Sequence, residues 1–141
     1  MDALHVPMER GVRLILFGSN DLGPTKYLAI IYESFSEISV FVNNQTNRRF
    51  LQENKIKTID FEEIKESNYS FELIITGTSN GDLENSLDKQ LIMFGKRNKI
   101  KTISIIEHWS WYKKRFKSKN NLYYPDYIFV NDKFAYKSAL D

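Results

Sequence analysis

A glutamate and a histidine stand side by side in the segment IIEHWSWYKKRF, which runs from Ile105 to Phe116. Histidine exchanges a proton near neutral pH and a carboxylate can orient it, so the pair is a candidate for acid and base chemistry. Adjacent residues on an extended strand point to opposite faces, so the two side chains need not be in contact. His108 is therefore the candidate catalytic residue, and Glu107 is its candidate orienting residue.

The same segment is rich in aromatic and basic side chains. Trp109 is a candidate for lining a ligand pocket, and Lys113 and Arg115 are candidates for contacts with an anionic group. A second interpretation fits equally well: the aromatic residues pack the loop onto the core, and the basic residues form a solvated helix face. The sequence leaves both interpretations open.

Two further loops could bind a ligand through backbone amides and hydroxyl groups. GSNDLGP (residues 18–24) leads from an apolar run into a helical pattern, and TGTSNGD (residues 76–82) follows another apolar run. The first is no GxGxxG fingerprint and has no Walker lysine in register, so a tight turn explains it at least as well. Capping of the next helix by Ser79 or Asn80 explains most of the second. The candidate ligand-binding residues of these loops are Gly18, Ser19, Asn20, Thr76, Gly77, Thr78 and Ser79.

The composition argues against several other chemistries. With no cysteine and only two histidines, the chain has poor means to hold a metal and cannot form a disulfide. No serine stands in a GxSxG elbow. A phosphorelay receiver needs an acidic pair after the first strand, and FGSND supplies only Asp21. We expect no metal and no tightly bound cofactor.

Six apolar runs predict the strands that carry these loops. Each run is short, nearly continuous in apolar residues and followed by Gly, Asn, Asp or a polar loop, as in strands buried on both faces. The predicted strands are residues 12–18, 38–43, 56–60, 71–77, 100–106 and 127–132.

Segments with helical spacing separate these runs. They are residues 23–35, 46–54, 61–67, 82–99 and 131–141, with Thr46 as the expected cap of the second and Asn131 or Asp132 as that of the last. Alternating strands and helices predict an α/β fold: a doubly wound, mostly parallel sheet of about six strands between two helical layers, Rossmann-like. In such sheets ligands bind at the carboxyl ends of the strands, where all the loops above begin, together with NNQTN (residues 43–47).

Length and charge place the chain among ordinary globular domains. It has 141 residues, 42% of them hydrophobic, and a formal net charge of +2. We expect residues 1–141 to form a single Rossmann-like domain in the cytoplasm, without a signal peptide, a transmembrane segment or specific binding to nucleic acid. The predicted helix from residue 131 stops after about two turns, which suggests the N-terminal half of a longer two-domain enzyme.

The second half of the chain resembles a known superfamily. IITGTS (residues 74–79), KTISIIEHWSWYKKRF (residues 101–116) and YPDYIFVNDKFAYKSAL (residues 124–140) are similar to the N-terminal half of bacterial GT-B-type glycosyltransferase-like proteins of surface polysaccharide synthesis, a superfamily that includes nucleotide-sugar 2-epimerases. The resemblance implies that residues 76–79 and 107–109, with Asn131 and Asp132, line a cleft between two Rossmann-like halves. It also implies that the donor nucleotide sits mostly on a C-terminal half, which this chain lacks.

Two functions follow as expectations. The first is an acceptor-side domain of a glycosyltransferase-type enzyme, incomplete alone, which works with a missing C-terminal domain or partner subunit on a glycan or lipid-linked acceptor. The second is a noncatalytic Rossmann-like module that binds a nucleotide or a protein and regulates another process.

Overall fold

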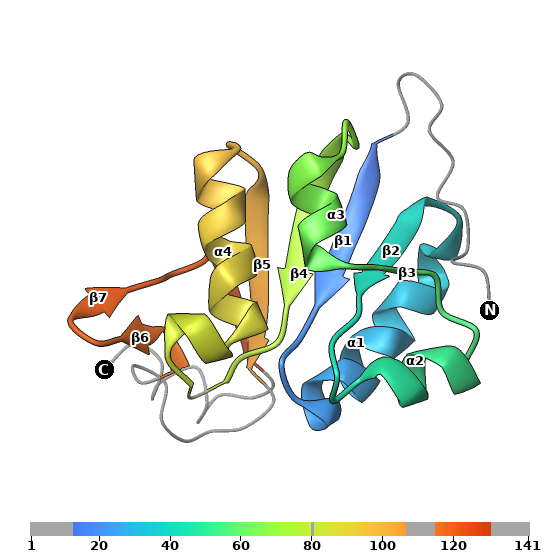
Figure 1. The fold of residues 1–141 in the computed structure, drawn as a ribbon, viewed down its shortest axis with the longest axis horizontal. Helices are drawn as coiled ribbons and strands as arrows, with labels where there is room; N and C mark the ends of the chain where they lie inside the picture. The colour runs from blue at the N-terminus through green and yellow to red at the C-terminus, as the bar shows by residue number, and fades with distance from the viewer. Residues whose placement is uncertain (1–12, 80, 107–114, 131–141) are drawn as a thin grey trace.

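Six parallel strands form the centre of the molecule (Figure 1). The computed structural model describes residues 13–79, 81–106 and 115–130. The sheet has the strand order β3-β2-β1-β4-β5-β8, and all its pairings are parallel. Its strands are β1 (Leu14–Gly18), β2 (Ser39–Val42), β3 (Thr58–Ile59), β4 (Phe71–Thr76), β5 (Lys101–Ile106) and β8 (Tyr127–Val130). The predicted α/β fold class with a parallel, Rossmann-like sheet is confirmed.

The strand order reverses beside the first strand. From β1 the chain moves outward to β2 and β3, and then returns to place β4 on the other side of β1. The loops that follow β1 and β4 therefore diverge from neighbouring positions at the same edge of the sheet. This is the position where doubly wound sheets bind ligands.

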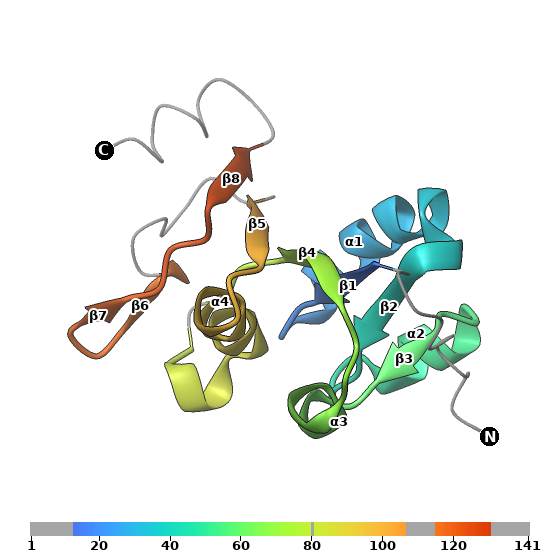
Figure 2. The same cartoon turned by 90° about the horizontal axis from the view of Figure 1, so that it is seen from above.

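Helices cover both faces of the sheet because the strands carry apolar side chains on both faces. The helices α1 (Leu22–Ser34) and α2 (Arg48–Glu53) pack on one face with Ile15 and Phe17 of β1. The other face packs against α3 (Phe61–Glu66) and α4 (Leu87–Arg97) through Leu14 and Leu16. Figure 2 shows α1 on one side of the sheet and α3 and α4 on the other.

The segment expected to be one helix over residues 82–99 is divided in two. A short 3-10 helix, η2 (Leu83–Asn85), precedes α4, and Ser86 between them has an extended backbone. Its hydroxyl accepts a hydrogen bond from the backbone N–H of Lys89 and so caps α4. Of the two predicted caps, Ser79 caps neither helix, because Asp82 precedes η2 and Ser86 precedes α4, and Asn80 lies outside the described residues. The expected cap of α2 was also wrong, since Asn47 rather than Thr46 occupies that position.

A small hairpin lies beside the main sheet and was not predicted. It pairs β6 (Lys117–Ser118) with β7 (Asn121–Leu122) in antiparallel fashion and projects at the left of Figure 1. Lys119 in its turn has a φ of 55°, in the left-handed region. A lysine gives little sequence signal for such a conformation, which glycine and asparagine adopt more readily.

Candidate functional site

The loop after β1 is fixed by the asparagines that follow β2. Ser19 is fully buried, and its carbonyl oxygen accepts hydrogen bonds from Asn44 Nδ2 at 3.2 Å and from Asn47 Nδ2 at 2.6 Å. Asn44 Oδ1 in turn accepts the backbone N–H of Asn47 at 2.9 Å. The predicted loops 18–24 and 43–47 therefore do come together, and two hydrogen bonds to the Ser19 carbonyl join them.

Asn20 connects the same loop to the start of α4. Its Oδ1 accepts the backbone N–H of Leu87 at 3.3 Å, and its own backbone N–H donates to Asp88 Oδ2 at 3.3 Å. The side chain of Asn20 thus accepts the hydrogen bond of a backbone N–H group at the first turn of α4. That amide would otherwise be available to an anionic ligand.

Glycine at position 77 reflects a close approach of the loops where the strand order reverses. A Cβ at Gly77 would lie 2.5 Å from Pro24 Cβ and 2.7 Å from Ser19 Oγ, so a larger residue does not fit. The shallow hollow beside it, lined by Pro24, Tyr27, Leu28, Gly77 and Ile105, has no room for a water molecule. Gly77 is therefore in close contact with Pro24 and Ser19 where the described parts of the β1 and β4 loops meet.

The hydroxyl groups of the loop after β4 are buried and hydrogen-bonded within the protein. Thr76 Oγ1 and Ser104 Oγ lie 2.6 Å apart, and so do Ser79 Oγ and Ser86 Oγ. Gly18, at the end of β1, packs against α4, because an added Cβ would overlap Leu91. Of the predicted ligand-binding hydroxyls in this loop, two are engaged in structural pairs.

A buried lysine holds the following turn in place. Lys89 is fully buried, and its Nζ donates to the carbonyl oxygen of Ser79 at 2.9 Å and to that of Gly81. Burial lowers the pKa of this ammonium, and the nearby carboxylates of Asp88 and Asp82 partly offset the shift. The backbone carbonyls of a loop thus take the place of water around a buried charge.

Asp88 is the most perturbed titratable group among the described residues. It is 1% exposed, and its Oδ1 has no hydrogen-bond partner in the described part of the chain. Burial raises the pKa of Asp88 to about 6, although the Ser79 hydroxyl and the Asn20 amide favour the charged form. Sequence reasoning missed both Asp88 and Lys89. A signal was present, because Asp88 shares the spacing of Leu91, Ile92 and Gly95, all buried on α4.

Arg115 is the one predicted phosphate contact that the structure describes. Its Nη1 donates to Thr78 Oγ1 at 2.9 Å, which places the guanidinium beside the carboxyl end of β4. A second hydrogen bond joins residues 115–118 to the chain that follows β4, since Ser118 Oγ accepts the backbone N–H of Leu83 at 2.7 Å. Residues 115–118 and the loop after β4 therefore form one hydrogen-bonded unit.

The other predicted site residues lie outside the described residues. They are Glu107, His108, Trp109 and Lys113, together with Asn131 and Asp132. The described strands that precede them in sequence, β5 and β8, end at the same edge of the sheet as β1 and β4.

Residues 13–79, 81–106 and 115–130 contain no group of three His, Asp or Glu side chains that could bind a metal ion. Among the same residues, no helix has the length and apolar character needed to cross a bilayer. The chain matches no family model, no curated protein and no solved structure.

Proposed function

We propose that the chain is the Rossmann-like, acceptor-side half of a glycosyltransferase-type enzyme that uses nucleotide sugars in bacterial surface-glycan synthesis in the cytoplasm. The observation that carries the proposal is the place of Arg115, held by Thr78 beside the carboxyl end of β4. A guanidinium at this edge of a doubly wound sheet suits the diphosphate of a lipid-linked acceptor, because its permanent positive charge attracts phosphate.

The closed loops at the strand reversal support an acceptor site rather than a donor site. A nucleotide diphosphate needs open backbone amides at a glycine turn, and here Gly77 packs against Pro24 and Ser19. The amide of Leu87 is also occupied, by Asn20. The donor nucleotide would then bind to a second domain or partner subunit across the cleft.

In this proposal, the catalytic and sugar-binding residues belong to the segment that follows β5 in the sequence. His108 would accept the proton of the acceptor hydroxyl group. The oxygen of that hydroxyl group would at the same time bond to the anomeric carbon of the donor sugar. The nucleoside diphosphate would leave with the electron pair of the broken bond. Glu107 would orient His108, Trp109 would stack against a sugar ring, and Lys113 would join Arg115 at the diphosphate.

A second candidate function is a noncatalytic module that binds a nucleotide or a protein. The internal pairing of Ser79 with Ser86, and of Lys89 with two loop carbonyls, favours this alternative. Both interactions stabilise a fixed loop, and neither gives it a reactive group.

Titration calorimetry with two kinds of ligand separates these functions. Geranyl diphosphate serves as a soluble mimic of the acceptor, and UDP-, GDP- and CMP-linked sugars serve as donors. We expect the chain to bind geranyl diphosphate, with a Kd about tenfold higher in Arg115→Gln, because a charged hydrogen bond to phosphate is lost. Arg49→Gln is the matched control, since Arg49 is exposed on α2 and pairs only with Glu53 among the described residues.

Two results would count against the acceptor assignment. One is binding of a nucleotide sugar by the chain alone with no affinity for geranyl diphosphate, which would favour the regulatory module. The other is an equal loss of affinity in Arg115→Gln and Arg49→Gln, which would show a nonspecific charge effect.

A further inference from the structure

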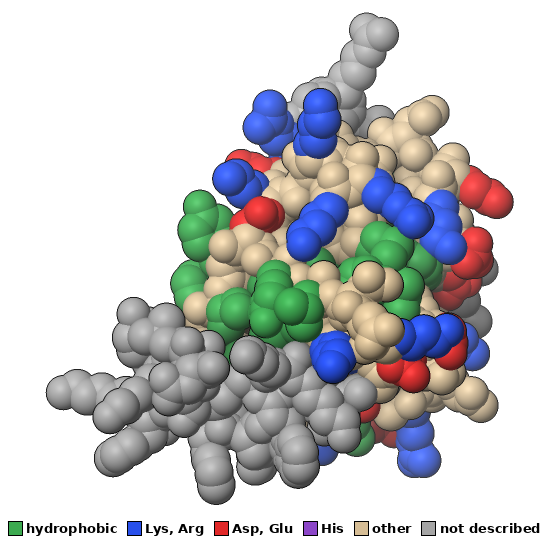
Figure 3. Space-filling model, turned by 90° about the vertical axis from the view of Figure 1, so that its left-hand side faces the viewer, with side chains coloured by type: hydrophobic (Ala, Val, Ile, Leu, Met, Phe, Trp, Pro, Cys, Tyr) green, Lys and Arg blue, Asp and Glu red, His purple; other side chains and the backbone are tan. Residues whose placement is uncertain are grey.

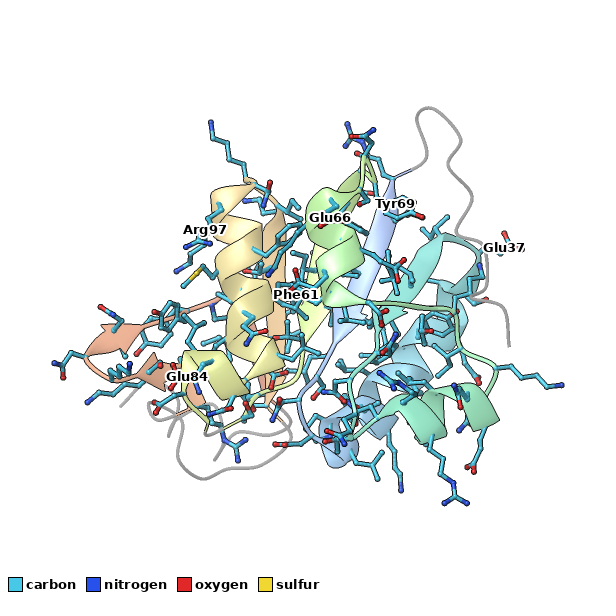
Figure 4. All side chains as sticks on the ribbon, in the orientation of Figure 1. Glu37, Phe61, Glu66, Tyr69, Glu84 and Arg97 are labelled. Carbon is cyan, nitrogen blue, oxygen red and sulfur yellow. The ribbon has the colours of Figure 1, made fainter. Side chains whose placement is uncertain are left out.

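The strand β8 is one of the two edge strands of the main sheet. Figure 2 shows β8 at one end of the sheet and β3 at the other. Figure 4 shows Phe61 between α3 and α4, which cover one face of the strands further in. β8 pairs with β5 alone among the described strands. The backbone N–H and C=O groups along its outer edge therefore have no partner strand in the described part of the chain.

The side chains of β8 are apolar and mostly exposed. Tyr127 is 52% exposed, Ile128 36% and Phe129 55%, whereas Val130 is half-buried against the cluster that contains Ile106. Figure 3, which views the molecule from this end of the sheet, shows a band of hydrophobic side chains on the surface. Edge strands usually carry charges, prolines or bulges, which prevent them from pairing with another chain. The four residues of β8 include none of these features.

The opposite edge of the sheet is protected from such pairing. β3 has only two residues, Thr58 and Ile59, and Ile59 is buried. Lys57 and the exposed Asp60 lie on either side of it in the chain. A short edge strand between charged residues offers little to a second strand. The edge of β8 is therefore the better suited of the two to pair with another strand.

The sequence of β8 is complementary to itself in an antiparallel pair. When Ile128 of one chain stands opposite Ile128 of a second chain, Tyr127 of each chain stands opposite Phe129 of the other. Residues opposite one another in such a pair point to the same face of the sheet. Tyr127 and Phe129 meet this condition, because alternate residues of a strand share a face. This register makes two aromatic pairs and one aliphatic pair, and no like charges meet within the strand.

We propose that β8 pairs with β8 of a second copy of this chain, in antiparallel fashion, about a two-fold axis beside Ile128. The two sheets then form one continuous sheet, and the exposed rings of each β8 pack against those of the other. A formal net charge of +2 gives little repulsion between two copies. A different protein would need a matching strand of its own, whereas every copy of this chain carries one. The inference does not rest on the proposed glycosyltransferase function.

Sedimentation equilibrium of the full chain over a range of concentrations tests this proposal. The native chain is compared with Ile128→Lys, which would place two lysines opposite each other across the two-fold axis. Ile30→Lys is the matched control, because it makes the same change at a side chain of α1 that is 70% exposed. Circular dichroism establishes that each variant is folded.

We expect the native chain to dimerise with a Kd on the order of 10 µM, because a contact between short strands is small. The Kd should rise at least about tenfold in Ile128→Lys, since like charges directly opposite each other destabilise a strand pair, and stay within about twofold in Ile30→Lys. A native chain that remains monomeric at about 0.2 mM would overturn the proposal, and so would equal weakening by the two variants.

A single introduced cysteine tests the register, because the chain has no cysteine of its own. Opposite residues of an antiparallel pair have Cα atoms about 4.5 to 5.5 Å apart, which a disulfide can span. Ile128→Cys should therefore form a disulfide-linked dimer under mild oxidation, and Ile30→Cys should not. If Ile128→Cys links no faster than Ile30→Cys, the two copies do not meet at β8 and the proposal fails.

Discussion

The charges buried at the start of α4 are the least expected residues of this chain. Asp88 and Lys89 lie next to each other in sequence, and both are almost completely buried. Lys89 satisfies its charge with two loop carbonyls, whereas Asp88 leaves Oδ1 without a partner among the described residues. An ionised carboxylate in this position costs folding free energy that a neutral group would not cost.

The pKa of Asp88 makes that cost measurable. The pKa is about 6 in the fold and 3.8 in the reference state, so the folded chain binds the proton more tightly. The contribution of Asp88 to stability is thus fully present below about pH 4 and is lost as pH rises through about 6. Relative to the native chain, Asp88→Asn should gain about 2 kcal/mol in free energy of unfolding between pH 4 and pH 8.

Chemical denaturation at a series of pH values checks this prediction. The nearby charges of Asp21 and Lys89 also act on Asp88, so the same series is measured with Glu63→Gln, an exposed carboxylate on α3, as the control. If the free energy of unfolding of Asp88→Asn differed from that of the native chain by the same amount at every pH, the assigned burial of an ionised carboxylate at position 88 would be contradicted.

At the level of elements, α4 connects the two loops at the strand reversal. Ser86 begins the helix by accepting the N–H of Lys89, and it also shares a hydrogen bond with Ser79. Asn20 of the β1 loop bonds to the next residue, Leu87. One short segment therefore fixes the start of a helix and the positions of two loops.

Removal of the Ser86 hydroxyl should destabilise the fold. Ser86→Ala loses the helix cap and leaves Ser79 Oγ without its partner, so we expect the free energy of unfolding to fall by about 1 to 2 kcal/mol. Ser86→Thr should recover most of the loss. Urea denaturation with Ser70→Ala, an exposed serine, as control measures both effects. Equal stability of Ser86→Ala and the control would refute the role of the cap.

The elements differ in how well the sequence predicts them. The strands β1 and β2 are predictable because each is an apolar run that is buried on both faces. The break between η2 and α4 is harder, since Leu83 and Leu87 keep helical spacing across it, and only the capping hydrogen bond of Ser86 shows where α4 starts. The β6–β7 hairpin has two residues per strand and a lysine in the left-handed region, so its sequence carries little pattern.

At the scale of the whole molecule, the fold brings the described parts of the predicted loops to one edge of the sheet. The sequence correctly places residues 18–24, 43–47 and 76–82 at the carboxyl ends of the strands. The role of the Ser79 side chain could not be assigned from sequence, because the tertiary structure brings its hydroxyl to that of Ser86, beyond the turn. The guanidinium of Arg115 is the described group that suits an anionic ligand at this edge.

Chemical-shift mapping by NMR is the most direct test of the acceptor-side assignment. The chain is titrated separately with geranyl diphosphate and with UDP-glucose, and backbone amide shifts are followed. We predict saturable shifts at Thr78 and residues 115–118 with geranyl diphosphate, and none there with UDP-glucose. Shifts centred on residues 18–23 with UDP-glucose, and none at Thr78 with geranyl diphosphate, would contradict the assignment and identify the β1 loop as a nucleotide site.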